Sequence, residues 1–363
     1  NYIGDYAHQL HVDTILSRRE TIATGIPIAD SLRAITPSDG YPSVLAELRG
    51  RFGDVVHHPG GTLWDASDEE IASAAHAAGG ADVAVLVLGE RSALTDDGIT
   101  GETSDRMHLG LPGRQQDLLE AVVATGTPVV LVLIAGRPLA VPWAAEHCAA
   151  VVHAWLPGER GAEAIADVLT GAVNPGGKMP VTTPRHVGQL PVYYAHRPTG
   201  GHSNWKVEYV DGSNLPLWPF GFGRSYTSFE LSGLALSASE IAPDGEVEVS
   251  TTVRNIGDRV GDEVVQLYVR DVAASLTRPV KELRGFARVG LEPGQSRTVT
   301  FTLAAEQLAF VDVPGRWLVE PGEFRLMVGT SSVDLPLEAT LTVGGTARHV
   351  ESRSRYLTEV SVR

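Results

Sequence analysis

ADVAVLVLGERSALTDDGITGETSDRMHLGLPGRQQDLL, residues 81–119, is the stretch that decides the fold of the first half of the chain. It begins as an unbroken apolar run, stops at Gly89-Glu90, crosses a polar segment with five carboxylates between Glu90 and Asp105, and then enters a helix. Apolar runs without alternation, separated by helices, are typical of parallel strands covered on both faces. We therefore expect an α/β domain, with any chemistry at the carboxyl end of this strand, where such sheets place their ligands.

The same pattern continues on both sides of this stretch. Asp65 and Ser67 are N-cap candidates for a helix over 68–78, because Glu69 and Glu70 follow in its first turn, where the helix dipole favours negative charge. Further helices are expected near 44–48, 112–126, 143–147 and 158–169, and strands at 83–88, 129–134 and 150–154. Residues 1–190 are thus predicted to form an α/β sandwich domain with a mostly parallel sheet.

The composition and the hydrophobic pattern of the chain change twice beyond this domain. Residues 191–229 are dense in Gly, Pro and aromatics, and we expect a connector held down by packing of its own side chains. Alternating segments then follow at 247–253, 263–269, 297–303, 324–328 and 339–343. Short alternating strands at this spacing indicate an all-β sandwich of immunoglobulin or fibronectin type III character over 230–345, followed by a tail at 346–363.

Composition excludes several classes of protein. The net charge of −15 and the lack of a basic stripe argue against nucleic acid as a partner, because phosphate binding relies on clustered Lys and Arg. The apolar runs are too short to span a bilayer, so no membrane partner is expected. Cys148 is the chain's one cysteine and cannot form an intrachain disulfide. The compartment stays open between the periplasm or secretion and the cytoplasm.

Motifs for cofactors and metals fail in this sequence. The glycines at 221–226 lack the third glycine of a dinucleotide fingerprint, and the stretch 176–179 has Met where a phosphate loop needs Ser or Thr. Ser225 lacks the second glycine of a nucleophile elbow. His57 and His58 are adjacent, so on a strand they would point to opposite faces, and no cluster supports a metal site. We expect neither cofactor nor metal.

The carboxylate segment remains as the candidate for chemistry. Taken alone, Glu102 in TGETSD reads as a solvated residue. However, Gly98 and Gly101 allow this segment to move, and it follows the carboxyl end of a buried strand. A carboxyl group on such a segment suits a general acid that approaches a bound substrate, and both interpretations stay open at this level.

Several long strings resemble one family. They are VLVLGE at 85–90, LGLPGRQQDLLEAV at 109–122, TPVVLVLIAGRPLAVPW at 127–143, AWLPGERGAEAIADVLTGAVNPGGKMPVTTPRHVGQLPVYY at 154–194 and PLWPFGFGRSYTSF at 216–229, continuing into VVQLYVRD, RPVKELRGF and EPG. Nearly the whole chain resembles the carboxyl-terminal two-thirds of a family 3 glycoside hydrolase of the β-glucosidase and β-xylosidase group, with bacterial periplasmic β-glucosidases especially similar.

The resemblance implies a (β/α)8-type barrel, then an α/β sandwich, then a fibronectin type III-like domain, of which this chain contains the last two. The first strand of the α/β domain is also expected to be missing, because NYIGDYA at 1–7 resembles the residues that come after that strand in the family. The barrel is then expected on a second chain or a missing segment, and this chain alone is expected to be inactive. The resemblance leaves room for a homodimer.

The resemblance also implies the chemistry, that of a retaining, exo-acting β-glycosidase that removes the non-reducing-end sugar from a β-linked glycoside or oligosaccharide. The nucleophile would be an aspartate of the barrel, and Glu102 in GETSDR would be the general acid/base. We further expect Asp96, Asp97 and Trp205 as substrate contacts. Asp105 and Arg106 are expected to form a local pair that orients the segment.

The alternative from another class is a non-catalytic carbohydrate-binding or scaffolding protein that kept these two domains after losing the barrel. Sugar binding without hydrolysis would favour it. A nucleotide-using α/β enzyme is disfavoured by the failed motifs.

Overall fold

A computed structural model describes residues 41–91, 98–101, 104–198, 209–351, 355–356 and 358–363. The expectations for residues 1–7 and for Asp96, Asp97, Glu102 and Trp205 lie outside the described residues. Contacts between Cα atoms divide the chain into two units. The first comprises the described residues up to Val173 together with Pro184–Leu190, and the second comprises Asn174–Thr183 and the rest of the chain. Residues 174–183 thus group with the second unit, whereas Pro184–Leu190, at the end of the expected domain, group with the first.

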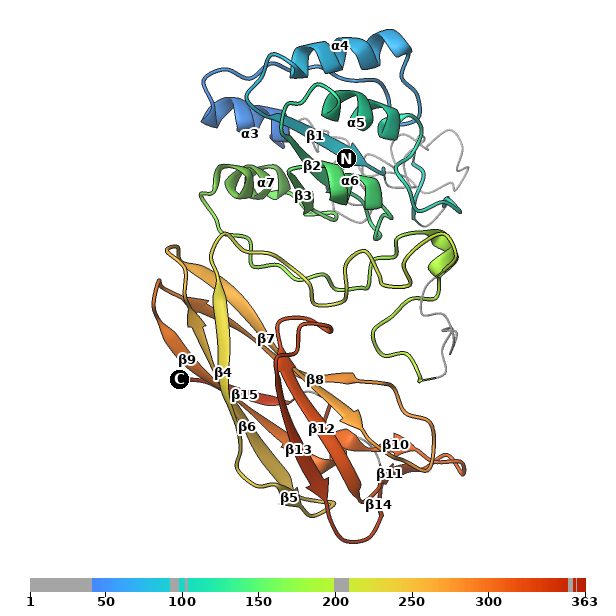
Figure 1. Ribbon diagram of the computed structural model, residues 1–363, viewed down its shortest axis with the longest axis vertical. Coiled ribbons are helices and arrows are strands. Elements are labelled where there is room, and N and C mark those ends of the chain that lie inside the picture. Colours follow the sequence, from blue (N-terminus) through green and yellow to red (C-terminus); the bar gives the residue numbers. More distant parts are fainter. Residues whose placement is uncertain (1–40, 92–97, 102–103, 199–208, 352–354, 357) are drawn as a thin grey trace, which may run out of the picture. The chain divides into compact units, whose positions relative to one another are not determined.

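The first unit contains a parallel sheet in the order β1-β2-β3 (Figure 1). Its strands are β1 (Ala84–Gly89), β2 (Val129–Ile134) and β3 (Ala150–His153). Ala84 lies opposite Val129, and Val130 lies opposite Ala150, so all three strands run in the same direction and end at the same edge. The parallel sheet predicted from the apolar runs is confirmed.

Helices cover this sheet as the sequence pattern predicted. They are α3 (Val44–Arg51), α4 (Asp68–Ala78), α5 (Gln115–Val123), α6 (Pro142–His147) and α7 (Gly161–Thr170). On one face, Val44 of α3 and Ile165 of α7 pack in one cluster with Val132 of β2. Successive side chains of a strand point to opposite faces, so the fully buried Leu131 and Leu133 face the other side of the sheet.

Capping at the start of α4 explains why this helix was predictable. The hydroxyl of Ser67 accepts a hydrogen bond from the Glu70 amide at 3.2 Å, while the Glu70 carboxylate accepts one from the Ser67 amide at 2.7 Å. This capping box satisfies two backbone donors that the helix itself leaves free. Ile71 and Ala74 form the buried stripe.

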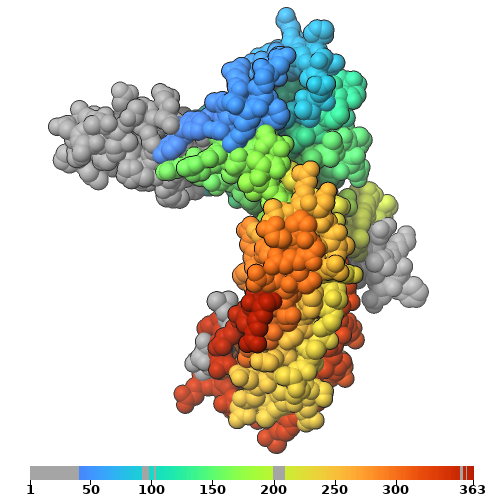
Figure 2. Space-filling view, turned by 90° about the vertical axis from the view of Figure 1, so that its left-hand side faces the viewer, coloured from blue at the N-terminus to red at the C-terminus, as the bar shows by residue number. Residues whose placement is uncertain are grey.

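The second unit is a β-sandwich. Its strands are β4 (Phe229–Leu236), β5 (Glu240–Ile241), β6 (Glu246–Asn255), β7 (Gly261–Asp271), β8 (Glu282–Leu291), β9 (Ser296–Ala304), β10 (Phe310–Val311), β11 (Trp317–Val319), β12 (Gly322–Gly329), β13 (Leu337–Val343), β14 (Arg348–Val350) and β15 (Glu359–Val362). Two sheets, β5-β13-β12-β7-β8 and β15-β9-β6-β4, enclose one apolar core. In Figure 2 the strands from β4 to β9 can be found by their yellow to orange colour. The expected all-β domain is confirmed.

In the second unit the C-terminal segment differs from the expectation, whereas the connector agrees with it. The segment expected as a tail provides β14 and β15, which pair with β11 and β9. The connector lies against the sandwich: the ring of Tyr194 stacks on Phe220 at 4.6 Å between centroids and meets Tyr268 edge-on at 5.6 Å. For these residues the packing expected of the connector's aromatics is present.

A half-buried histidine ends β3. Both ring nitrogens of His153 are shielded from solvent and have no hydrogen-bond partner among the described residues. The ring lies 4.0 Å from that of Trp155, measured between centroids. Burial lowers the pKa of His153 to about 4, because desolvation penalises the charged imidazolium.

Gly89→Ala tests the close approach of β1 to β2. Gly89 has a φ of 139°, and a Cβ atom there would lie 2.0 Å from the carbonyl oxygen of Ile134. We expect this substitution to lower the free energy of unfolding by at least about 2 kcal/mol in urea denaturation. Gly53→Ala is the control, since a Cβ at Gly53 meets nothing within 4 Å. Equal losses in the two variants would contradict this account.

His153→Phe tests the buried imidazole. The folded-state pKa of about 4 lies below the unfolded value near 6.5, so the unfolded chain binds the proton more readily. His153 therefore removes stability as the pH falls from about 6.5 to about 4, by at most about 1.4 kcal/mol per pH unit. Urea denaturation across this window should show a shallower pH dependence for the variant, with no loss of stability at pH 7. Parallel stability curves for variant and parent would contradict the prediction.

Candidate functional site

The three parallel strands bring separate polar residues to one edge of the sheet. We name this the carboxyl edge and define it as residues 89–91 from the end of β1, 135–137 after β2 and 153–155 from the end of β3. It is the position where α/β sheets usually bind ligands. The carboxylate segment begins here, as expected, because Glu90 directly follows β1.

Glu90 is the buried charge of this edge. Its side chain is 1% exposed, and its Oε1 atom lies 2.7 Å from Nη1 of Arg106 and 2.9 Å from Nη2 of Arg137. Nε of Arg137 donates to the other carboxylate oxygen at 3.1 Å. Three charge-assisted hydrogen bonds therefore compensate one carboxylate that would otherwise be costly to bury.

Arg137 extends this pairing to the far end of the carboxylate segment. Its Nη1 atom donates to Oδ1 of Asp105 at 2.8 Å and to the carbonyl oxygen of Arg106 at 3.0 Å. Burial alone would lower the pKa of Arg137, but its hydrogen bonds to Glu90 and the charges of Glu90 and Asp105 outweigh this and raise the pKa. We call Glu90, Asp105, Arg106 and Arg137 the arginine network.

The sequence analysis anticipated Asp105 and Arg106 but not their partners. We expected these two side chains to pair with each other. In the structure the Asp105 carboxylate accepts a hydrogen bond from the backbone amide of Arg106 at 2.7 Å, while the guanidinium of Arg106 binds Glu90 and the carbonyl of Gly110. Their role in orienting the segment stays a prediction. Arg137, which binds both carboxylates, was missed, because a loop arginine 47 residues from Glu90 gives no local signal.

Gln115 is a second residue that sequence reasoning missed. It is 8% exposed, and its side-chain amide donates to the Gly89 carbonyl at 3.0 Å while its oxygen accepts from the Gly89 amide at 2.8 Å. It also donates to the Leu63 carbonyl at 3.3 Å. A glutamine in the first turn of a helix usually reads as exposed, yet here it fixes the backbone from which the carboxylate segment departs.

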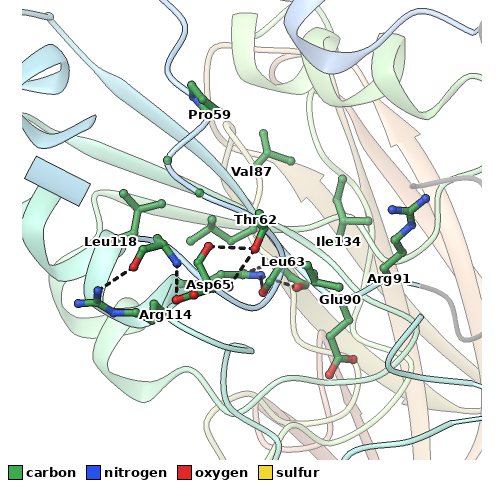
Figure 3. Close-up of a pocket in the computed structure, with 16 residues that line it drawn as sticks. Pro59, Thr62, Leu63, Asp65, Val87, Glu90, Arg91, Arg114, Leu118 and Ile134 are labelled. Atoms are coloured by element: carbon green, nitrogen blue, oxygen red, sulfur yellow. Dashed lines mark hydrogen bonds between the residues drawn. The ribbon is translucent and has the colours of Figure 1, made fainter. Parts of the chain in front are cut away.

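A pocket of about 270 Å³ lies beside this strand end (Figure 3). Its wall combines the loop at 59–66 with the residues from Val87 to Arg91 and with α5. In Figure 3 the Glu90 carboxylate points away from this hollow, so the backbone of Glu90 lines the pocket while its side chain joins the arginine network. Arg114 pairs with Asp68 and Asp117 at 2.8 Å each and closes one side.

Backbone strain marks the third strand end. Trp155 has a φ of 55°, and it is the one residue other than glycine with positive φ in the described part of the chain. Such a conformation is unfavourable for a bulky side chain and is often found at functional sites. Trp155 lies within the carboxyl edge, beside His153.

Two of the five carboxylates in the segment are thus accounted for. Glu90 and Asp105 are bound by arginines, whereas Asp96, Asp97 and Glu102 lie outside the described residues.

Within the described ranges, no group of three or more His, Cys, Asp or Glu side chains could hold a metal ion. Of the helices that the structure describes, none is both long and apolar enough to cross a membrane.

Comparison with protein families places this site in a known context. The model of the glycosyl hydrolase family 3 C-terminal domain matches residues 1–226, and that of the fibronectin type III-like domain matches residues 263–332. The chain is 43% identical over 353 residues to the periplasmic β-glucosidase of Salmonella typhimurium, covering 87% of this chain and 46% of the relative. It is 42% identical over 295 residues to a β-xylosidase of Formosa agariphila, covering 80% of this chain and 40% of the relative.

Solved structures agree with this relationship. The β-glucosidase from Listeria innocua in complex with isofagomine has a TM-score of 0.76 at 38% identity, with 84% of this chain and 42% of the relative covered. The chain therefore spans less than half the length of each of these three relatives. The family suggested by the sequence strings is confirmed: the chain belongs to glycoside hydrolase family 3, and it contains that family's C-terminal domain followed by a fibronectin type III-like domain.

Proposed function

We propose that this chain supplies the general acid/base of a retaining, exo-acting β-glucosidase, and that Glu102 is that residue. The observation that carries the proposal is the arginine network. It binds Glu90 and Asp105 with guanidinium groups at 2.7–2.9 Å, so both carboxylates already have a structural partner. Among the three remaining carboxylates of the segment, Glu102 stands in the GETSDR motif that the family resemblance points to.

The reaction requires two carboxyl groups about 5–5.5 Å apart on either side of the glycosidic bond. In the first step Glu102 donates its proton to the leaving oxygen while the barrel aspartate attacks the anomeric carbon. In the second step the Glu102 carboxylate takes a proton from water, and the resulting hydroxide equivalent displaces the aspartate from the sugar. Glu102 ends protonated, so the cycle returns to its starting state.

The substrate class is inferred from the relatives. They are named β-glucosidases and β-xylosidases, and the Listeria innocua relative has been solved in complexes with glucose and with laminaribiose. We propose a β-linked glucoside or gluco-oligosaccharide as the substrate, with Asp96, Asp97 and Trp205 as further contacts to it.

The other half of the active site is proposed to lie outside this chain. The chain covers 46% and 40% of the length of the Salmonella typhimurium and Formosa agariphila relatives, and the described residues contain no (β/α)8 barrel. We propose that a barrel on a second chain or on a further segment provides the nucleophile and most sugar contacts. The two domains described here would then be inactive by themselves.

Glu102→Ala in the assembled enzyme tests the assignment. For a glycoside with a poor, unactivated leaving group we expect kcat/KM to fall about 10²–10⁴-fold, because the leaving oxygen is no longer protonated. For a 2,4-dinitrophenyl glycoside, whose leaving group needs no proton, kcat/KM should change little. Azide should restore part of kcat for this activated substrate, since it attacks the glycosyl-enzyme without a general base.

Glu120→Ala is the matched control, because Glu120 is an exposed glutamate of α5 that pairs with Gln116 at 2.8 Å. Full activity of the Glu102 variant toward an unactivated glycoside would overturn the proposed role. Sugar binding without hydrolysis by the parent protein would instead favour the non-catalytic alternative.

A further inference from the structure

We propose that Arg137 is a positioning residue for this reaction, which it serves by fixing the two ends of the segment that carries the general acid/base. This inference rests on the proposed function of Glu102. Arg137 itself follows β2 and belongs to a different loop from the carboxylate segment.

The fork of Arg137 binds the beginning and the end of the segment at once. Nε and Nη2 bind the two carboxylate oxygens of Glu90 at 3.1 and 2.9 Å, at the point where the chain leaves β1. Nη1 binds the Asp105 carboxylate at 2.8 Å, at the point where the segment returns. One planar group therefore sets the distance between residues 15 positions apart in sequence.

Arg137 also binds the backbone at the end of the segment. The carbonyl oxygens of Arg106 and His108 accept from Nη1 and Nη2 of Arg137 at 3.0 and 3.3 Å. Arg106 adds a second link across the same ends, because its guanidinium binds Glu90 at 2.7 Å. The amide of Ile99 donates to the carbonyl of Arg91 at 3.0 Å and joins the described middle of the segment to its beginning.

The geometry calls for arginine in particular. The Arg137 side chain is 18% exposed and uses all three of its nitrogens on five acceptor atoms. Lysine would keep the charge but could not form the same bidentate fork, because an ammonium is a single point donor. A small displacement of a catalytic group can cost about 100-fold in rate, so losing the fork should appear in proton transfer.

A merely structural arginine would give a different signature. If Arg137 only stabilised the fold, its loss would lower the activity toward all glycosides by the same factor, through the fraction of folded enzyme. If it positions the acid, the loss should depend on how much the leaving group needs a proton. The ratio of kcat/KM between an activated and an unactivated glycoside separates these cases.

The test is Arg137→Lys in the active, assembled enzyme. We expect kcat/KM to fall about 10- to 100-fold for an unactivated glycoside and less than about 3-fold for the 2,4-dinitrophenyl glycoside. Arg51→Lys is the matched control, since Arg51 binds Asp167 at 2.7 Å and the Glu163 carbonyl at 3.4 Å within the same unit but links helices α3 and α7. Its ratio should remain that of the parent.

Asp105→Asn keeps the proposal testable if Arg137→Lys folds poorly. The Asp105 side chain is 65% exposed, so this change costs little stability, yet it replaces the charged acceptor of Arg137 at the far end of the segment by a weaker, neutral amide oxygen. It should shift the same ratio in the same direction by a smaller factor.

Equal losses for both glycosides in Arg137→Lys and in Asp105→Asn would overturn the positioning role. The proposed function would survive that result as long as Glu102→Ala retains its own leaving-group dependence. If Glu102→Ala shows no such dependence, the proposed function itself fails, whatever the arginine variants do.

Discussion

The buried carboxylate of Glu90 between two guanidinium groups is the interaction on which the rest of the carboxyl edge depends. A carboxylate whose side chain is 1% exposed has lost its hydrogen bonds to water, and Arg106 and Arg137 replace them at 2.7 and 2.9 Å. These partners come from two different loops. Satisfying one charge therefore fixes the ends of both loops against the sheet, together with Gln115, which holds the backbone of Gly89.

This arrangement links the fold to the proposed chemistry. A parallel sheet ends all of its strands at one edge, so residues that are distant in sequence meet there. The segment that we propose to carry the acid leaves this edge at Glu90 and returns at Asp105. A general acid must be held close to the leaving oxygen in the correct orientation. A network of short ion pairs at both ends of its segment would restrict the conformations that this segment can adopt.

Much of the fold could be read from the sequence, but the contacts of the site could not. The apolar run at 129–134 matches β2, and Ser67, one of the two N-cap candidates, starts α4, because both signals are local. Strand β15 was missed because its four residues, Glu359–Val362, are exposed, and two alternating valines are too short a pattern to distinguish a strand. Arg137 was missed because the partners that its guanidinium binds, Asp105 and Glu90, are 32 and 47 residues away in the sequence. Only the folded sheet brings these residues together.

A double-mutant cycle between Glu90 and Arg137, measured by urea denaturation, tests the central claim most directly. Glu90→Gln, Arg137→Met and the double variant would give the coupling free energy of the pair, free of the separate effect of each substitution. The account predicts a coupling of about 2–3 kcal/mol, with each single variant strongly destabilised because it leaves the other charge buried. A coupling below about 0.5 kcal/mol would show that the two residues act independently and would contradict the account.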